Sequence, residues 1–497
     1  MSSRPKEFKN KPPRAPSSGS VPGRPPRAST TGTPAPGRPP PRFHESARTR
    51  TPDRPPARPP ARPSAPPPAR PAAPSPTSAH NAPPAHRRAT DAVEHFFATC
   101  PRGLEAALAS ELTTLGAANA RATDGGVAFE GRYALAYTVN LWSRLASRVL
   151  WQVGFGRYRD QQDIYDTALK INWPNWFDVT RTIRVNVTAV RSPLASLDFI
   201  TLKIKDAIVD RFRTATGERP SIDTAQPDVR VHAFLTGDTS TFYIDTSGEA
   251  LFKRGYRHTD DDLRVEAPLR ENLAAGMLAL SGWAAETPLL DPFCGGGTIV
   301  IEAAMLAADI APGLGRSFGF EQLSWHDADQ WQRVRDDAAR RAEGGRRTAN
   351  VRIAGSDIDR RAIESARANA EAAGVTKLID LQVGNALATT APFASGAIIT
   401  NPPYGFRLGV TEELRLLYAA YADTLKRHFA GWNAWILCGE LSLVKAIRLS
   451  PARRTPIFNG AIECRLVEYR LVSGSNRPDR GGKGVGGGKI TSSSEGA

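Results

Sequence analysis

The second half of the chain alternates short apolar runs with amphipathic segments. Five apolar runs have the length of buried strands: 289–293, 351–357, 379–386, 396–401 and 433–438. Helical spacing of apolar residues marks four segments between and before them: 268–281, the stretch from Thr298, 360–373 and 412–429. This alternation predicts an α/β fold with a doubly wound, mainly parallel sheet and right-handed crossovers. An alternating stretch at 455–471 predicts an antiparallel hairpin at the sheet edge.

Two smaller mixed units are predicted upstream of this sheet. The first combines strands at 96–98 and 126–130 with helices at 102–112 and 133–145. The second combines a strand at 182–188, a helix at 197–212 and a hairpin of 229–235 and 240–245. We therefore expect α+β domains at 91–158 and 159–258, followed by a Rossmann-like domain at 259–473. The segment 306–347 is longer than a crossover requires, and we interpret it as an insertion.

The terminal segments differ in composition from the rest of the chain. Residues 1–90 form a Pro/Arg/Ala/Ser tract with almost no large apolar side chains, so we expect a disordered tail. The glycine-rich segment 474–497 is expected to be flexible. The net charge of +15 is located mainly in 1–90, where 17 Lys and Arg stand against 3 Asp and Glu. The first tail could therefore seek phosphates or only aid solubility, and any nucleic-acid contact by the near-neutral remainder requires a local basic patch.

Cysteine content and hydropathy exclude several classes of protein. The four cysteines are scattered without a Cys-x-x-Cys pair, so neither a disulfide framework nor a zinc site is predicted. A reducing, cytoplasmic location follows as an expectation. No apolar run reaches the roughly 18 residues of a membrane span, so no membrane association is predicted.

A glycine-rich turn follows the first apolar run, in the sequence Leu289-Leu-Asp-Pro-Phe-Cys-Gly-Gly-Gly-Thr298. Glycines allow close approach of the backbone to a ligand, and ligands of open α/β sheets bind at the carboxyl ends of strands. No Gly-Lys-Ser/Thr follows, so a phosphate-binding loop is a poor interpretation. A nucleotide-like cofactor fits better, although a plain structural loop remains an alternative. The residues expected to hold the cofactor are Asp291, Pro292, Phe293, Cys294, Gly295, Gly297 and Thr298.

A second motif, Asn401-Pro-Pro-Tyr404, follows the apolar run 396–401. Pro402 and Pro403 have fixed φ angles and no N–H, which makes this loop stiff. An exocyclic amine of a base needs acceptors for its protons and a platform for its ring. Asn401 and the Pro402 carbonyl supply the acceptors, and Tyr404 supplies the aromatic face. Together the two motifs predict an amino-group methyltransferase that uses S-adenosylmethionine, with these four residues as the catalytic set and Asn401 also in contact with the cofactor.

Two further polar residues follow strands of the predicted sheet. Asp357 ends the second strand, where a carboxylate can accept both hydroxyls of a ribose. Asp359 is expected instead to cap the following helix. Asn385 follows the third strand, where it could contact an adenine edge or simply belong to the loop. Positioning supplies most of the rate in methyl transfer of this kind, and a paired base would have to be flipped out to reach the pocket.

These motifs, together with Lys253-Arg-Gly-Tyr-Arg257 and Ala267-Pro-Leu, resemble those of the THUMP-containing RNA guanine-N2 methyltransferases. The resemblance covers about 96–472 in order and is strongest to the members that act on large-subunit ribosomal RNA. It implies a ferredoxin-like unit, a THUMP RNA-binding domain and a Rossmann-like catalytic domain, with methyl transfer to N2 of a guanine in 23S rRNA. The RNA contacts that it implies are Lys203, Lys205, Arg230, Arg254 and Arg257.

Two departures from the family pattern affect this interpretation. Position 385 is Asn where the family usually has Asp, which puts the adenine contact in doubt. The second methyltransferase found in fused bacterial members is absent, so a single modification is expected.

Three alternatives remain open: a tRNA guanine-N2 enzyme, an adenine-N6 enzyme with the same Asn-Pro-Pro-Tyr chemistry, and an RNA-binding or ribosome-assembly factor without turnover.

Overall fold

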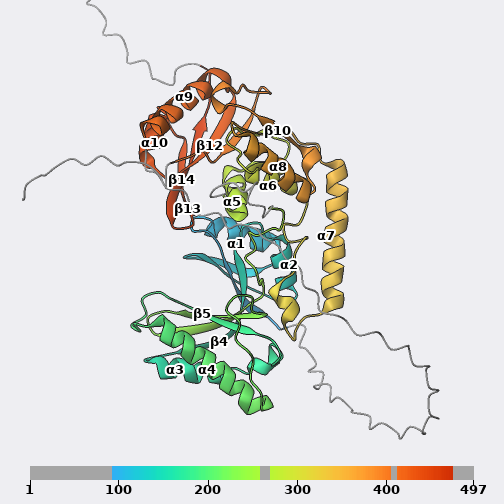
Figure 1. Cartoon of the computed structure of the whole chain (residues 1–497), viewed down its shortest axis with the longest axis vertical. Coiled ribbons are helices and arrows are strands. Elements are labelled where there is room, and N and C mark those ends of the chain that lie inside the picture. Colours follow the sequence, from blue (N-terminus) through green and yellow to red (C-terminus); the bar gives the residue numbers. More distant parts are fainter. Residues whose placement is uncertain (1–91, 258–268, 405–410, 474–497) are drawn as a thin grey trace, which may run out of the picture. The chain divides into compact units, whose positions relative to one another are not determined.

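The computed structural model describes residues 92–257, 269–404 and 411–473 (Figure 1). The expectations for the tails at 1–90 and 474–497 lie outside these residues. The described strands form two sheets of seven strands each. Their α/β character and the Rossmann-like arrangement of the second sheet confirm the predicted fold class.

The first sheet has the strand order β2-β3-β1-β4-β7-β6-β5. Its strands are β1 (Glu94–Thr99), β2 (Ala118–Thr123), β3 (Gly126–Gly131), β4 (Arg148–Arg157), β5 (Ile183–Ala189), β6 (Val229–Leu235) and β7 (Thr239–Asp245). The two upstream units predicted from the sequence therefore share one sheet, because β4 pairs with β1 on one side and with β7 on the other. No strand was predicted at β4, whose register shifts between Gln152 and Gly154 and interrupts a clean alternation.

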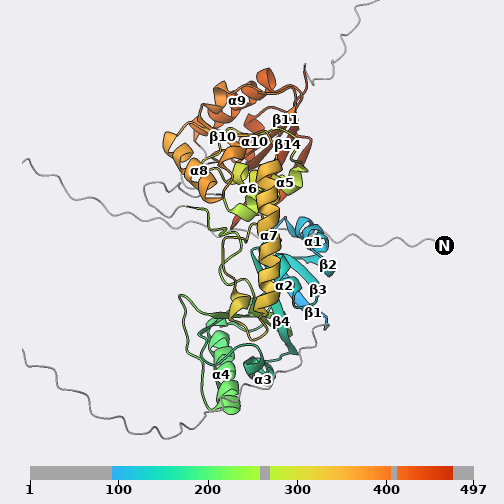
Figure 2. The same ribbon diagram turned by 90° about the vertical axis from the view of Figure 1, so that its right-hand side faces the viewer.

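Four helices accompany the first sheet: α1 (Glu105–Thr114), α2 (Leu135–Trp142), α3 (Gln161–Lys170) and α4 (Leu197–Thr216). The helices α3 and α4 lie side by side in both Figure 1 and Figure 2. The buried face of α4 carries Ile200, Ile204, Ile208 and Phe212 at helical spacing. The short helix η1 (Trp173–Asn175) follows α3.

The second sheet has the order β10-β9-β8-β11-β12-β14-β13. Its strands are β8 (Leu289–Asp291), β9 (Ile353–Asp357), β10 (Ile379–Val383), β11 (Gly396–Thr400), β12 (Trp432–Cys438), β13 (Arg453–Asn459) and β14 (Ile462–Arg470). The first five in this order are parallel, and β14 and β13 are antiparallel. This confirms the doubly wound sheet and its edge hairpin. The strand predicted at 379–386 is shorter than expected, since β10 ends at Val383 and η5 (Ala386–Ala388) follows.

Six helices belong to this part of the chain: α5 (Glu271–Ser281), α6 (Thr298–Ala307), α7 (Ala328–Thr348), α8 (Arg360–Ala372), α9 (Glu412–His428) and α10 (Leu441–Ala446). Two short helices, η3 (Gly319–Gln322) and η4 (Thr376–Leu378), complete the elements. The long helix α7 lies within the predicted insertion. Its N-terminus is capped by Asp327, whose carboxylate accepts a hydrogen bond from the Gln330 amide.

Partly buried hydrogen bonds join the first sheet region to α5 and to the segment that follows α6. The Asn272 amide of α5 donates to the Ser147 hydroxyl at 2.9 Å. The Arg144 guanidinium donates to the Ile310 carbonyl at 2.7 Å. The second sheet region therefore shares polar contacts with residues that lie far upstream in the sequence.

Candidate functional site

The carboxyl ends of β8, β9, β10 and β11 lie at one edge of the second sheet. In the parallel register, Asp291 of β8 pairs with Gly355 of β9, Val383 of β10 pairs with Asp357 of β9, and Ile398 of β11 pairs with Leu290 of β8. The two sequence motifs therefore follow neighbouring strands and meet at the same edge, as expected for a ligand site of an open α/β sheet.

Backbone hydrogen bonds hold the glycine-rich loop against the end of β9. The Gly295 amide donates to Asp357 Oδ2 at 3.0 Å, and the Cys294 amide donates to the Ser356 carbonyl at 3.0 Å. Gly297 has φ +81°, and an added Cβ would lie 3.0 Å from the Ala366 side chain. A side chain at 297 would therefore be strained and crowded, which explains why the loop enters α6 through a glycine.

Asp357 orders two loops at once. Besides its bond to Gly295, it accepts the Asp359 amide on Oδ1 at 3.0 Å. Asp359 caps α8 by accepting the Arg361 amide, as the sequence predicted. Asp357 is half-exposed, and its carboxylate has lone pairs left for ligand hydroxyls. Its assignment as a ribose ligand stays a prediction.

Asp291 and Thr400 connect the two motif-bearing strands. The Thr400 hydroxyl donates to Asp291 Oδ1 at 2.6 Å, and the Phe293 amide donates to the same oxygen at 3.2 Å. Asp291 is only 1% exposed. Burial raises the pKa of this carboxyl from its ordinary value of 3.8 to about 7, while the Thr400 hydrogen bond opposes the rise.

The raised pKa of Asp291 predicts a specific pH dependence of stability. The folded-state pKa exceeds the unfolded value, so this contribution to stability is complete below pH 3.8 and is lost as the pH rises through about 7. Each pKa unit corresponds to about 1.4 kcal/mol. We expect Asp291→Asn to lack this loss, so that its Tm relative to the unsubstituted protein rises by about 5 °C or more between pH values of about 5 and 8. A Tm difference that is independent of pH would contradict a buried carboxyl of raised pKa.

Asn401 presents a buried acceptor at the end of β11. Its Oδ1 has no hydrogen-bond partner among the described residues. Buried side-chain oxygens are nearly always satisfied, so an unpartnered one at the end of a parallel strand indicates a ligand donor. The following Pro402 is buried and Pro403 is exposed.

Tyr404 is held at both its hydroxyl and its ring. The hydroxyl accepts a hydrogen bond from Asn459 Nδ2 at 3.0 Å. The ring lies over Gly439, where an added Cβ would approach it to 2.9 Å. One side of the ring therefore rests on backbone, an arrangement suited to a rigid stacking platform.

Three predicted cofactor residues direct their side chains elsewhere. Cys294 is buried, and its thiol packs against Gly355, which leaves only backbone atoms for a cofactor. The Phe293 ring contacts Tyr421 edge-on at 5.1 Å. The Thr298 hydroxyl accepts from Arg257 at 3.1 Å. Side-chain contacts to the cofactor are therefore not indicated for these residues, and Pro292 is buried as well.

Asn385 is exposed and caps η5. Its Oδ1 accepts the Leu387 amide at 2.9 Å. The oxygen that was expected to meet an adenine amine is thus already engaged by the backbone, although a second lone pair remains.

The structure contradicts the prediction that Arg254 contacts RNA. Arg254 is 5% exposed and forms an ion pair with Glu302 of α6 at 3.3 Å. It also donates to the carbonyl of Leu251 at 2.7 Å and to that of Arg144. Such a side chain is a structural cation in the interior of the protein and cannot reach a phosphate.

We expect Arg254→Ala to destabilise the protein rather than to weaken RNA binding selectively. Removing one partner of a buried ion pair leaves the carboxylate of Glu302 uncompensated and costs about 3–5 kcal/mol. Thermal unfolding should show a lower Tm, and the double variant Arg254→Met/Glu302→Leu should recover much of the loss. An unchanged Tm with reduced RNA affinity would restore the original prediction.

Arg257 and Arg230 are also engaged within the protein. Arg257 forms an ion pair with Glu271 and bonds the Leu269 carbonyl and Thr298. Arg230 pairs with Glu249 at 3.3 Å, and 14% of its side chain is exposed. Neither guanidinium is available for RNA without giving up a partner.

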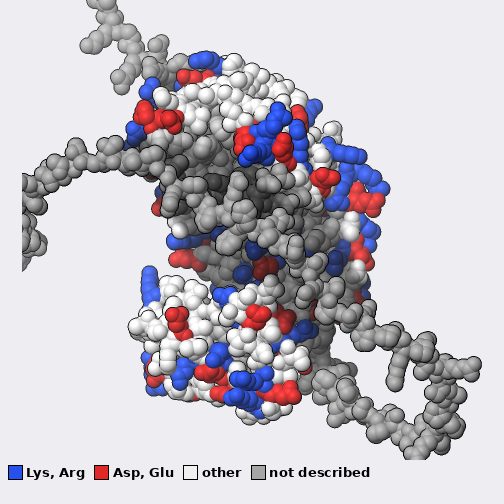
Figure 3. All heavy atoms as spheres, in the orientation of Figure 1, with Lys and Arg blue, Asp and Glu red and all other residues white. Residues whose placement is uncertain are grey.

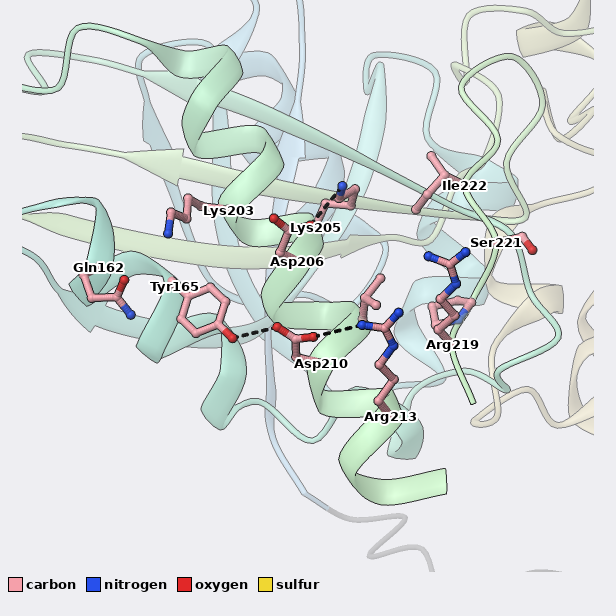
Figure 4. Close-up of a pocket in the computed structure, with 12 residues that line it drawn as sticks. Gln162, Tyr165, Lys203, Lys205, Asp206, Asp210, Arg213, Arg219, Ser221 and Ile222 are labelled. Carbon is pink, nitrogen blue, oxygen red and sulfur yellow. Dashed lines mark hydrogen bonds and ion pairs between the residues drawn. The ribbon is translucent and has the colours of Figure 1, made fainter. Parts of the chain in front are cut away.

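Lys203 and Lys205 line a cavity of about 850 Å³ beside α3 and α4 (Figure 4). Lys203 lies 5.7 Å from the centres of the Tyr165 and Phe199 rings. Lys205 pairs with Asp206 at 2.9 Å. Figure 4 also shows the ion pair of Asp210 with Arg213. The carboxylates of Asp206 and Asp210 offset part of the positive charge predicted for this helix face.

On the face shown in Figure 3, basic and acidic side chains are interspersed among the residues that are not grey. This agrees with the near-neutral charge of the chain outside its tails. Any RNA contact by the described residues therefore depends on local features rather than on a broad positive field.

Sequence reasoning missed three polar residues that shape the site. Thr400 ties β11 to Asp291, Glu302 neutralises Arg254, and the buried hydroxyl of Ser356 has no partner among the described residues. The position of Thr400 directly before Asn401 was a sequence signal that could have identified it. No sequence signal distinguishes the other two from ordinary helix and strand residues.

The described part of the chain holds no group of three or more His, Cys, Asp or Glu placed to bind a metal ion. Within the same residues, no helix is both long and apolar enough to cross a bilayer.

Comparison with family models matches three successive regions of the chain. An RlmL ferredoxin-like domain matches 95–150, and a THUMP domain matches 158–245. The RMKL-like methyltransferase domain matches 254–468. The ribosomal RNA large subunit methyltransferase K/L of Shewanella baltica (strain OS185) is 44% identical over 387 residues, which cover 78% of this chain and 54% of that relative. The chain thus spans about half the length of the curated relatives that it matches.

Two solved structures extend the likeness. SMU.472, described as a methyltransferase and crystallised with SAH, is 30% identical, with a TM-score of 0.69 and coverage of 77% of this chain and 99% of that one. A protein described as a predicted N6-adenine-specific DNA methylase from Listeria monocytogenes is 29% identical, with a TM-score of 0.69 and coverage of 76% and 97%.

Proposed function

The chain belongs to the THUMP-containing methyltransferases with RlmL ferredoxin-like and RMKL-like domains, and from this we propose that it methylates N2 of a guanine in 23S rRNA. The cofactor would be S-adenosylmethionine, which supplies an electrophilic methyl group when bound. The crystallisation of SMU.472 with SAH, together with a glycine-rich loop ordered by Asp357, supports this choice. The buried and unpartnered Oδ1 of Asn401 is the observation that carries the proposal.

The residues around the sheet edge fit such a cofactor. Gly295 and Gly296 are half-buried and lie beside Asp357, whose carboxylate can accept ribose hydroxyls, whereas Gly297 is buried. Asp291 and Thr400 hold this loop at a fixed distance from Asn401. The arrangement positions cofactor and base through strand ends rather than through mobile side chains, which favours reaction by orientation.

Asn401 and Pro402 would orient the target amine. The Asn401 Oδ1 accepts a hydrogen bond from one N–H of the exocyclic amine, and the Pro402 carbonyl accepts a hydrogen bond from the other N–H. These bonds favour a pyramidal nitrogen with its lone pair directed at the methyl group. The Tyr404 ring, fixed by Asn459 and Gly439, stacks on the base, a contact worth about 1–3 kcal/mol.

Transfer of a labelled methyl group tests the proposal. The full chain should transfer label from S-adenosylmethionine to 23S rRNA and not to DNA. Transfer to tRNA alone would favour the tRNA guanine-N2 alternative. RNA binding without transfer to any nucleic acid would favour the non-catalytic assembly factor. Because the proposed substrate is ribosomal RNA and the four cysteines are all buried free thiols, we propose a cytoplasmic location.

A substitution at Asn385 tests the adenine contact. An aspartate can cap η5 with one oxygen and accept an adenine amine with the other, and a charged acceptor strengthens the bond. We expect Asn385→Asp to bind S-adenosylmethionine equally or a few-fold more tightly in calorimetric titration. A large loss of affinity would show that residue 385 does not contact the adenine.

A further inference from the structure

The strands β4, β7, β6 and β5 present two unlike faces. On one face, apolar side chains are buried beneath α3 and α4. The buried residues of this face are Val231, Ala233, Leu235, Phe242 and Ile244. The side chains that alternate with them point to the opposite face. On that face the exposed residues include two phenylalanines.

The strand register places these phenylalanines in one row. Phe155 of β4 is opposite Thr241 of β7, and Thr241 is opposite Phe234 of β6. The two rings are therefore two strands apart, a separation of roughly 10 Å. Phe155 is 60% exposed and Phe234 is 37% exposed, whereas Phe242 on the other face is fully buried. The rings are far enough apart to hold different ligand groups.

Guanidinium groups flank this row. Arg157 faces Thr239 at the end of β4, and Arg184 lies on β5 with its guanidinium bonded to the Thr224 carbonyl at 2.7 Å. Both side chains are exposed, and neither has a carboxylate partner among the described residues. The carboxylate of Asp245 on the same face is buried and paired with Arg148. The hairpin between β6 and β7 adds the exposed carboxylate of Asp238 next to Thr239, so the two guanidinium groups lie beside the rings together with exposed negative charge.

A cavity of about 540 Å³ adjoins this row at the edge of β4. Phe155 and Arg157 line it together with Thr167 and Lys170 of α3, so the cavity lies at the strand edge on the α3 side and is not part of the open face. Exposed aromatic rings bordered by unpaired cations are the combination that binds single-stranded nucleic acids, because bases stack on the rings while cations meet phosphates.

We propose that the open sheet face, defined by Phe155, Phe234, Arg157 and Arg184, binds an unpaired segment of the substrate RNA. Bases stack on Phe155 and Phe234, and phosphates contact Arg157 and Arg184. The proposal rests on RNA being the substrate. It places the base contacts on the sheet face that α3 and α4 do not cover. The lysines Lys203 and Lys205, with the neighbouring Asp206 and Asp210, lie on α4 instead.

Binding of a labelled oligouridylate to the full chain tests this face. The probe has about twelve nucleotides, within the range that single-strand-binding surfaces cover. We expect Phe155→Ala and Phe234→Ala each to weaken binding by about 5- to 150-fold, as the loss of one stacked base predicts. Phe393→Ala is the matched control, since Phe393 is a 39% exposed phenylalanine before β11, and it should change affinity by less than about twofold.

Two further variants separate stacking from other causes. Phe155→Trp should preserve binding, and Phe155→Leu should not, because leucine keeps an apolar contact without a ring. Equal binding by the leucine variant would indicate a protein partner on this face and overturn the proposal. Arg184→Ala should weaken binding and make it less salt-dependent.

Methyl-transfer kinetics distinguish a failure of this inference from a failure of the proposed function. For the Phe155→Ala/Phe234→Ala variant, KM for rRNA should rise while kcat and cofactor affinity stay the same. If the unsubstituted chain methylates rRNA and this variant has an unchanged KM, the sheet-face proposal alone is wrong. If the unsubstituted chain methylates nothing, the proposed function is wrong, and the oligouridylate titration still decides the sheet-face proposal.

Discussion

Replacing Asn401 with alanine is expected to lower kcat for methyl transfer by at least about a hundredfold. The side chain ends β11, and its buried Oδ1 has no protein partner among the described residues. A single preorganised polar group at a reacting centre typically contributes about 10²–10³ in rate. Cofactor affinity should change little, because the glycine-rich loop is held by Asp357 and Asp291 instead. Single-turnover kinetics at saturating rRNA and cofactor give the rate directly.

Two control variants sharpen the test of Asn401. Asn401→Asp keeps an oxygen acceptor, so it should retain more activity than the alanine variant. Asn459→Ala removes only the hydrogen bond to the Tyr404 hydroxyl and should have a smaller effect on kcat. Substantial turnover by Asn401→Ala would remove this residue from the catalytic role, whatever the controls show.

Replacing Asp357 with alanine is expected to weaken binding of S-adenosylmethionine by about 10²–10⁴-fold. Hydrogen bonds to a charged group contribute about 1.5–3 kcal/mol each, and two ribose hydroxyls would be lost as donors. The substitution also releases the amides of Gly295 and Asp359, which loosens both loops around the cofactor. Calorimetric titration of the full chain measures the change.

Asp359→Ala is the matched control for this prediction. It lies two residues further on and caps α8 through the Arg361 amide. Loss of an N-cap costs about 1 kcal/mol of stability. Its Tm should therefore fall slightly while cofactor affinity is nearly retained. Equal effects of the two aspartate variants on affinity would mean that Asp357 acts only through loop stability.

The strands of the second sheet could be predicted from the sequence because the residues at their ends have recognisable local patterns. The buried runs before Asp291 and Asn401, the glycine turn and the double proline each have a local physical meaning. The parallel sheet then brings these ends together by topology alone. The cap formed by Asp359 was predictable for the same reason, since it depends only on neighbouring residues.

Features that depend on distant partners could not be predicted in this way. Arg254 looked like a basic surface residue, but its environment is set by Glu302, 48 residues further along the chain. The β4–β7 pairing joined two units that the local pattern had separated, and a register shift hid the β4 strand. Asp206 follows Lys205 directly in the sequence, but the sequence does not show that the two side chains form an ion pair.

Identification of the methylated nucleoside tests the central claim most directly. Unmodified 23S rRNA made by transcription is incubated with the full chain and labelled S-adenosylmethionine, digested to nucleosides and separated by chromatography with mass detection. We expect the label in N2-methylguanosine and its loss with Asn401→Ala. Label in N6-methyladenosine, or none in rRNA under conditions where cofactor binds, would contradict the central claim.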